Sequence, residues 1–419
     1  MGKNKRVFVL GSGFSKSLIS DMPLISGFFS ENNRKLVNRN NDKKFEELYQ
    51  FISDNNKIFG ESEFSFNVER LATFLHSNSY YKNKEDKYYF NIVKDQLINY
   101  INSLIKYSSF QSNYIYNYSH ENIKELYFQF KEKVKEICSF FVGCDENTTF
   151  VTYNYDLILE RILLSARRNV SFNNNGINRI LEENGLDKCD YFWEYKDFLK
   201  VSKDADTFQK LTGAYRQWKL SSAFNLTTGY GFRAYPFEKL HSDNGQVRFI
   251  NSKIKIYKLH GSINWFKYKG YRKADFDNIA IGVPNTDTYF NIIQDHQSFL
   301  ENEGSIKSMF EPIPEIIPMT YTKGLYLEKP LYEIIWSRAY KSLLDADEIY
   351  FIGYSFPDTD INNIYFYKSF DKKIAGICVK SVDENDFNRF KDRINVVFPR
   401  LREGVFSNKD ACEYLSELS

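Results

Sequence analysis

Four short polar segments of this 419-residue chain carry the residue types that chemistry on a small molecule requires. GSGFS at 11–15 is a glycine-rich turn whose backbone N–H groups can surround an anion. NYD at 154–156 offers an amide and a carboxylate, and HGS at 260–262 offers an imidazole, which titrates near neutral pH. GYS at 353–355, followed by Asp360, is a second glycine turn. They form a ligand pocket if the fold brings them together.

Each segment also has an explanation that involves no ligand. A tight strand-to-helix turn accounts for GSGFS, and Asn154 and Asp156 can simply cap the helix that follows them. His260 can be a satisfied histidine in a tight loop, and Gly353 can relieve strain in a turn. Because all four segments come directly after predicted strands, their combination favours the ligand pocket.

Alternating strands and helices are expected to position these segments. Apolar runs predict a strand before each of them, and two more strands near the C-terminus, at 6–10, 148–152, 254–259, 348–352, 374–379 and 394–398. Helical patterns between the strands include 14–20, 157–168, 330–344 and 384–393. This alternation predicts an α/β fold with a Rossmann-like parallel sheet, in which residues at the carboxyl ends of strands converge.

Long helical stretches are predicted to interrupt the sheet. Amphipathic patterns follow the first strand, and a stretch without clear periodicity follows the second. We expect a discontinuous Rossmann-type domain with a helical insertion, a second insertion and a C-terminal helix. The domain comprises 1–30, 146–170 and 251–400, the insertions are 31–145 and 171–250, and the last helix is 401–419.

The glycine turn does not complete the dinucleotide fingerprint of dehydrogenases. Lys16 stands where the pattern G-x-G-x-x-G has its last glycine. In addition, no acidic residue ends a credible second strand about 20 positions further on. Hydride transfer is therefore disfavoured.

Composition excludes several classes of function. The 56 Lys and Arg balance 54 Asp and Glu and are scattered, which argues against nucleic-acid binding by bulk charge. The five cysteines form no C-x-x-C pair, so we expect reduced thiols and no zinc or other metal site. No apolar run is long enough for a signal peptide or a membrane span. We therefore expect a cytoplasmic protein that does not contact a membrane.

The ordered set GSGFS, TYNYD, LHGSINW and IGYSFPDTD resembles the sirtuin-like NAD-binding domain, in the divergent bacterial branch found in anti-phage defence. The motifs run from residue 8 to residue 360 in the family's order. The resemblance implies that the glycine turn holds the pyrophosphate of NAD and that His260 matches the family's catalytic histidine. Asn154, the second implied catalytic residue, and Asp156 would lie beside the nicotinamide ribose. The remaining NAD-binding residues implied are Gly11, Ser12, Gly13, Phe14, Ser15, Gly353, Tyr354, Ser355 and Asp360.

Two departures from the protein-deacylating sirtuins favour hydrolysis of NAD. The chain lacks the cysteine pairs of their zinc module, and its segment 21–26, DMPLIS, does not reproduce their Gly-Ile-Pro-Asp-Phe-Arg loop. The resemblance therefore implies an NAD glycohydrolase that releases nicotinamide and ADP-ribose, with NAD as its substrate. The alternatives are a protein deacylase or ADP-ribosyl transferase, and a non-catalytic module that senses NAD or ADP-ribose.

The resemblance also implies regulation. An unrestrained NAD hydrolase is toxic, so an abortive-infection effector must be released by a partner or by oligomerisation. Relatives in this branch work with a phage protein, a nucleic-acid-guided protein or a HerA-type ATPase. We expect such a separate activator, or a homo-oligomer, because no sensor module is recognisable in the chain.

Overall fold

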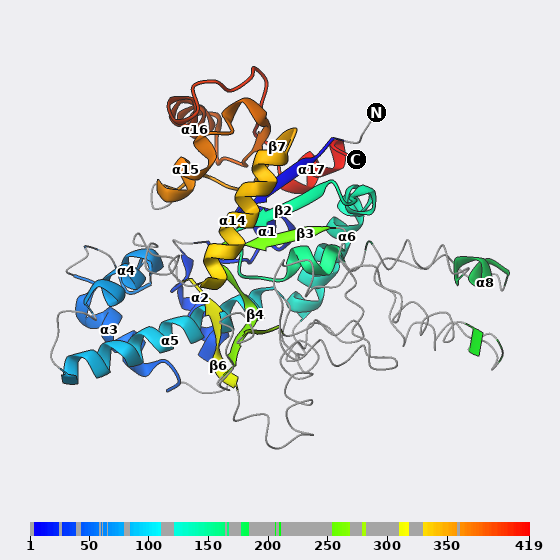
Figure 1. The fold of residues 1–419 in the computed structure, drawn as a ribbon. Helices are drawn as coiled ribbons and strands as arrows, with labels where there is room; N and C mark the ends of the chain where they lie inside the picture. The colour runs from blue at the N-terminus through cyan, green and yellow to red at the C-terminus, as the bar shows by residue number, and fades with distance from the viewer. Residues whose placement is uncertain are drawn as a thin grey trace.

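A six-stranded parallel sheet forms the centre of the fold (Figure 1). The computed structural model describes residues 4–24, 27–38, 43–57, 60, 62–64, 66–78, 84–109, 121–163, 166, 177–183, 206, 209–210, 254–268, 279–281, 310–317, 330–357 and 361–419. The strand order is β3-β2-β1-β7-β8-β9, and all neighbours are parallel. The strands are β1 (Arg6–Leu10), β2 (Thr148–Thr152), β3 (Lys255–Lys258), β7 (Glu348–Ile352), β8 (Ile374–Cys378) and β9 (Phe406–Ser407).

The strand order confirms a mixed α/β architecture that is consistent with a Rossmann-like fold. From β1 the chain builds outward through β2 to β3, then returns to the other side of β1 with β7 and continues to β9. In open sheets of this kind, ligands bind where the order reverses, outside the carboxyl ends of the strands. Here that point lies between β1 and β7, which pair in register from Arg6 and Glu348 to Leu10 and Ile352.

The strands are apolar because helices cover both faces of the sheet. On one face, the Phe8 ring of β1 lies 5.1 Å from Tyr350 of β7 and packs edge-on, at 5.0 Å, against Phe140 of helix α6 (Glu121–Gly143). On the other face, Phe351 packs edge-on, at 4.9 Å, against Tyr367 of α15 (Ile361–Lys368). Helix α14 (Pro330–Asp345) lies in the chain between β6 (Phe310–Ile316) and β7.

Helices of the predicted insertion 31–145 divide between two hydrophobic cores. Four of them form a core of their own with residues from the sheet region, while α6 packs into the core of the parallel sheet through Phe130, Val134 and Ile137. Figure 1 shows α3, α4 and α5 together beside β4 and β6. These four helices are α2 (Glu31–Asn38), α3 (Glu46–Asn55), α4 (Val68–Asn78) and α5 (Lys84–Ser108).

A second, antiparallel sheet begins directly after β3, where the sequence predicts only a hairpin-like piece. Its order is β5-β4-β6, with β4 (Gly261–Tyr268) between β5 (Ile279–Ile281) and β6 (Phe310–Ile316). Only Leu259 and His260 separate β3 from β4, so His260 lies in the turn between the two sheets. Gly261 has a φ of 82°, which a glycine adopts without strain.

Strands β1, β2 and β7 lie where the sequence predicts them, but the predicted strand 394–398 is wrong. Those residues end helix α16 (Glu384–Val397), which begins where the Asp383 side chain accepts a hydrogen bond from the Asp386 N–H. Phe387, Phe390 and Ile394 are buried at helical spacing, and this stripe outweighs the local β-branched run.

The last strand is instead β9, inside the region 401–419 that we predicted to be helical. Helix α17 (Ala411–Glu417) follows it, capped by Asp410. Of the predicted second insertion, 171–250, the structure describes only α8 (Ile177–Glu183) and three single residues. Within the described ranges, no helix is both long and apolar enough to span a lipid bilayer.

Candidate functional site

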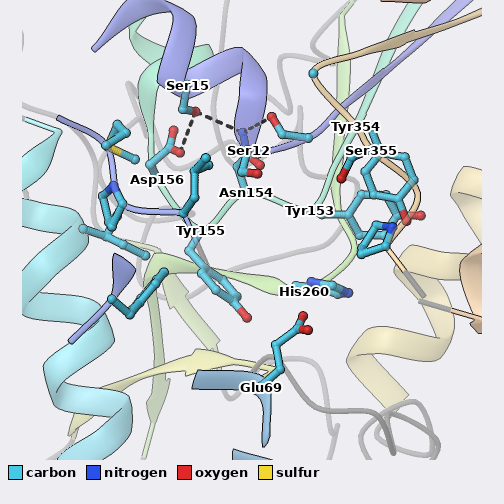
Figure 2. A pocket seen from close by; sticks show the side chains of 18 residues that line it. Ser12, Ser15, Glu69, Tyr153, Asn154, Tyr155, Asp156, His260, Tyr354 and Ser355 are labelled. Atoms are coloured by element: carbon cyan, nitrogen blue, oxygen red, sulfur yellow. Dashed lines mark hydrogen bonds between the residues drawn. The ribbon is translucent and has the colours of Figure 1, made fainter. Parts of the chain in front are cut away.

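The four polar segments meet in one cavity at the carboxyl ends of β1, β2, β3 and β7. Figure 2 shows their side chains around it, with residues of the helical insertion on the opposite wall. The cavity has a volume of about 110 Å³. Nine of the predicted site residues line it: Gly11, Ser12, Ser15, Asn154, Asp156, His260, Gly353, Tyr354 and Ser355.

The loops after β1 and β7 touch each other, and this contact explains three of the glycines. A Cβ on Gly11 would lie 2.5 Å from the Gly353 carbonyl oxygen, and one on Gly13 would lie 2.8 Å from the Gly353 Cα. Gly353 itself has a φ of 64°, and its Cβ would lie 2.2 Å from the Phe14 nitrogen. Packing of the two loops therefore requires glycine here, whether or not a ligand binds.

Two backbone donors of GSGFS that were predicted to face a phosphate are used within the protein, one of them in this contact. The Gly13 N–H donates to the Gly353 carbonyl at 2.9 Å, and the Phe14 N–H donates to the Gly11 carbonyl at 3.0 Å. The Phe14 side chain is buried in the sheet core, and neither Gly13 nor Phe14 lines the cavity. Ser12, which is exposed at the cavity, is thus the residue of GSGFS whose side chain remains open to a ligand, whereas Ser15 lines the cavity as a buried residue.

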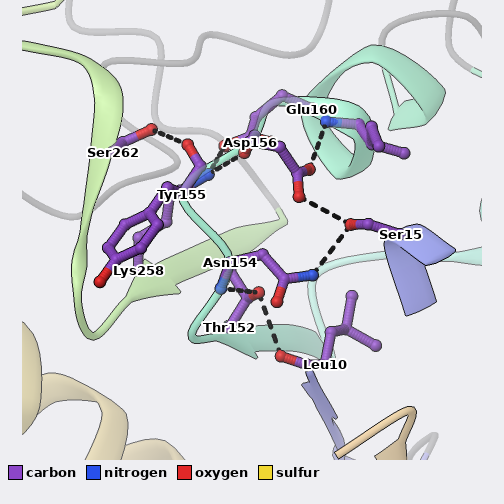
Figure 3. Close-up of polar contacts among 10 residues, drawn as sticks. Leu10, Ser15, Thr152, Asn154, Tyr155, Asp156, Glu160, Lys258 and Ser262 are labelled. Carbon is purple, nitrogen blue, oxygen red and sulfur yellow. Dashed lines mark hydrogen bonds and ion pairs between the residues drawn. The ribbon is translucent and has the colours of Figure 1, made fainter. Parts of the chain in front are cut away.

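Asn154 is held by a short polar chain that runs through Ser15 to Asp156 (Figure 3). The Asn154 side-chain amide donates to the Gly11 carbonyl at 2.9 Å and to the Ser15 hydroxyl at 3.0 Å. The Ser15 hydroxyl donates in turn to the Asp156 carboxylate at 2.7 Å. Both amide hydrogens are therefore used, and none of the described residues donates to the Asn154 Oδ1. That oxygen can accept a hydrogen bond from a ligand hydroxyl or a water molecule.

Asp156 is buried and acts on the site through Ser15. Its second carboxylate oxygen accepts the Ile158 N–H at 3.0 Å, at the start of the helix 158–163. Burial raises the pKa of Asp156, while the nearby Lys258 ammonium and the Ser15 hydroxyl oppose that rise. The Asp156 carboxylate therefore does two things: it caps the helix 158–163 and, through Ser15, it orients Asn154.

A buried ion pair, which sequence reasoning missed, supports this loop from below. The Lys258 ammonium lies 2.9 Å from the Glu160 carboxylate, and both side chains are at most 1% exposed. Lys258 also donates to the backbone carbonyl of Asp156. The signal in the sequence was a lysine at an inward position of the predicted strand IKIYKL, where an apolar residue is usual.

His260 lies in an aromatic part of the cavity. Its side chain is buried, and its ring packs edge-on against Tyr153 with 4.9 Å between ring centroids. Tyr153 stacks on Tyr354 at 4.7 Å and its hydroxyl is 2.8 Å from that of Tyr367. Burial raises the pKa of Tyr153 well above its usual value, so this phenol stays neutral. His260 thus faces neutral rings on this side.

The helical insertion and the loop after helix α1 (Ser12–Leu18) supply the opposite wall, which was also missed. Met22, Pro23 and Leu24 line the cavity although their segment departs from the sirtuin loop. Glu69 of α4, 5% exposed, and Ile105 of α5 complete this wall. Glu69 reads in the sequence as an ordinary acidic residue in the first turn of a helix, so nothing there marks it.

Asp360, predicted to bind NAD, lies outside the described residues. Within the part of the chain that the structure describes, no group of three or more His, Cys, Asp or Glu side chains is arranged to hold a metal ion. No protein-family model matches this chain, and a search of curated proteins finds no match either. The arrangement of the cavity must therefore carry the functional argument.

Proposed function

We propose that this protein is an NAD glycohydrolase, which cleaves NAD to nicotinamide and ADP-ribose. The observation that carries the proposal is that Asn154 and His260, on different loops, line one cavity at the reversal point of a parallel sheet. A nucleotide-binding position, an acceptor amide and an imidazole thus occur together. The resemblance of the four motifs to the sirtuin-like domain indicates NAD as the ligand.

Cleavage of the bond between nicotinamide and the ribose mainly requires that the protein position the reacting groups and stabilise the developing positive charge. Nicotinamide leaves from a cationic state, so cleavage of its bond to the ribose C1′ returns the electron pair to the ring nitrogen and needs no strong acid. Water attacks C1′ from the other face, and its proton passes to His260. The Asn154 oxygen accepts a hydrogen bond from that water or from a ribose hydroxyl, which holds the reacting groups in register.

The proposal also includes regulation of the hydrolase activity. A constitutively active hydrolase would drain cellular NAD, so we propose an abortive-infection effector that a separate partner or self-association switches on. The motif resemblance supports this part.

Nicotinamide release by the purified chain, alone and with candidate activators, tests the activity. We expect NAD cleavage without any peptide, and a loss of about 10²-fold or more in kcat for His260→Ala and Asn154→Ala, since positioned proton transfer contributes about 10²–10⁴-fold. Asn33→Ala is the matched control, because Asn33 is half-buried and its amide donates to the Gly27 carbonyl, away from the cavity.

The rival activities give different results in the same assay. Release that requires an acetylated peptide would identify a deacylase, and modified protein would identify a transferase. A sensing module would bind NAD or ADP-ribose in calorimetry with the purified protein. It would show no NAD turnover in vitro or in cells before and after phage infection. Full activity in both site variants would refute the assignment of Asn154 and His260.

A further inference from the structure

Glu69 reaches the cavity from the helical insertion, not from the parallel sheet. It lies in the first turn of α4, and its side chain is buried although it lines the cavity. Figure 2 shows its carboxylate pointing toward the His260 ring from the opposite wall. An acidic side chain from the helical insertion thus faces an imidazole from a loop at the end of the parallel sheet.

The backbone of Glu69 is anchored on both sides. Its N–H donates to the Asn67 side chain at 2.8 Å, which caps the helix together with the bond from the Arg70 N–H at 3.1 Å. Its carbonyl accepts the Thr73 hydroxyl at 2.7 Å. The carboxylate therefore leaves a fixed point at the N-terminal end of α4, where the helix dipole favours negative charge.

The described rings that pack around His260 belong to tyrosines. Tyr153 packs against its ring, Tyr155 lies 6.3 Å from it between centroids, and Tyr354 stacks behind Tyr153. Burial raises the pKa values of Tyr153 and Tyr354, so neither carries a charge near neutral pH. The Asp156 carboxylate is bound to Ser15 and to the Ile158 N–H. Among the described residues lining the cavity, Glu69 is the carboxylate aimed at the imidazole.

We propose that Glu69 is the positioning residue for His260: it orients the imidazole and stabilises the imidazolium that forms when His260 takes a proton. A cation that forms in a buried site needs a compensating charge. An opposite charge within about 4–6 Å favours the protonated form of a histidine. The base role of His260 rests on the proposed function, but the pairing of the two side chains does not. The insertion then completes the site.

The pairing is tested by titrating the histidines of the full-length chain with NMR, after labelling histidine with ¹⁵N and assigning His260 by its loss in His260→Ala. Glu69→Gln keeps the shape and removes the charge, and we expect it to lower the His260 pKa by about 1 unit or more. Glu69→Asp should restore part of the shift. Glu46→Gln, which neutralises an exposed carboxylate of α3, is the matched control and should leave the pKa unchanged.

Turnover supplies the second readout. We expect Glu69→Gln to lower kcat for NAD by about 10–100-fold while KM changes less than about threefold, because the effect lies in the protonated state. An unchanged His260 pKa in Glu69→Gln overturns the proposal, even if turnover falls, because Glu69 would then act on the substrate directly. A lowered pKa in a protein that cleaves no NAD keeps the pairing and refutes the proposed function instead.

Folding of the variants is checked by their melting temperatures. If Glu69→Gln does not fold, the wild-type titration decides the question. A His260 pKa above its ordinary value of about 6.5 supports the pairing, because burial alone lowers it. A value below about 6.5 overturns the pairing.

Discussion

Ser15 links Asn154 to the buried polar groups beneath the cavity. Its hydroxyl accepts one bond from the Asn154 amide and donates one to Asp156, so it sets the direction of the amide oxygen. Asn154 and Asp156 form no direct hydrogen bond with each other. Orientation of the proposed catalytic amide therefore depends on a serine that the sequence presents only as part of a glycine turn.

Replacing Ser15 with alanine should impair both stability and activity. We expect a loss of about 1–3 kcal/mol in the free energy of unfolding, because a buried carboxylate loses a donor, and a fall of about tenfold or more in NAD turnover. Urea denaturation and nicotinamide release measure the two effects.

Ser17→Ala is the control on the same helix. Ser17 is also buried, and its hydroxyl donates to the Phe14 carbonyl at 2.7 Å, but it does not line the cavity. Its removal should lower stability and leave turnover intact. Equal turnover in the two variants would contradict the role given to Ser15.

Among the elements, the contact between the loops after β1 and β7 is the tightest part of the site. Gly353→Ala should cost at least about 3 kcal/mol of unfolding free energy, because the left-handed backbone adds about 1–2 kcal/mol to the clash with Phe14. Gly404→Ala isolates the backbone effect, since Gly404 has a φ of 74° and open space around it. Similar losses in the two variants, measured by urea denaturation, would show that the loops tolerate separation.

The ion pair between Lys258 of β3 and Glu160 of the helix 158–163 joins two further elements. Lys258→Met should cost about 3–5 kcal/mol, because it leaves a buried carboxylate without its counter-ion. The double variant Lys258→Met with Glu160→Leu should recover most of that loss, since a well-packed apolar pair is often as stable. Denaturant midpoints of the two variants measure these losses of stability. A double variant that is no more stable than Lys258→Met would contradict the expectation.

At the scale of the whole molecule, the cavity lies between two hydrophobic cores. Sheet-end loops form one wall, and α4, α5 and the loop after α1 form the other. The second core also contains Tyr155, Leu157, Ile263 and Ile316, which come from the sheet side of the fold. A ligand in the cavity therefore contacts both.

Ligand binding should protect both walls from hydrogen exchange. With ADP-ribose bound to the His260→Ala variant, we expect slower amide exchange in α4 as well as in the loop 153–157, because bound ligand opposes the openings of either wall. Mass-spectrometric exchange with and without ligand makes the measurement. Protection confined to the sheet-end loops would mean that the insertion takes no part in binding.

Local pattern in the sequence was enough for most of the parallel sheet and for nine of the residues that line the cavity. Runs such as RVFVL, TTFVT and EIYFI are apolar throughout because both faces of a parallel strand are covered, and this pattern located β1, β2 and β7 to the residue. Since a parallel sheet brings the carboxyl ends of its strands to one edge, Asn154 and His260 could be placed together before any contact was seen.

Only the tertiary structure decided which groups face the cavity and what lies opposite them. Gly13 and Phe14 share a motif with Ser12 and Ser15, yet the Gly13 N–H donates to Gly353 in the loop after β7, 340 positions later in the chain, and the Phe14 N–H donates to Gly11 in its own turn. Glu69 looks like any first-turn acid until α4 packs beside the sheet, and Ile394 continues a helical stripe although its neighbours favour a strand. Hydrophobic periodicity in a sequence predicts which side of a helix or strand is buried. It does not predict which distant segment packs against that side, because that depends on the tertiary fold.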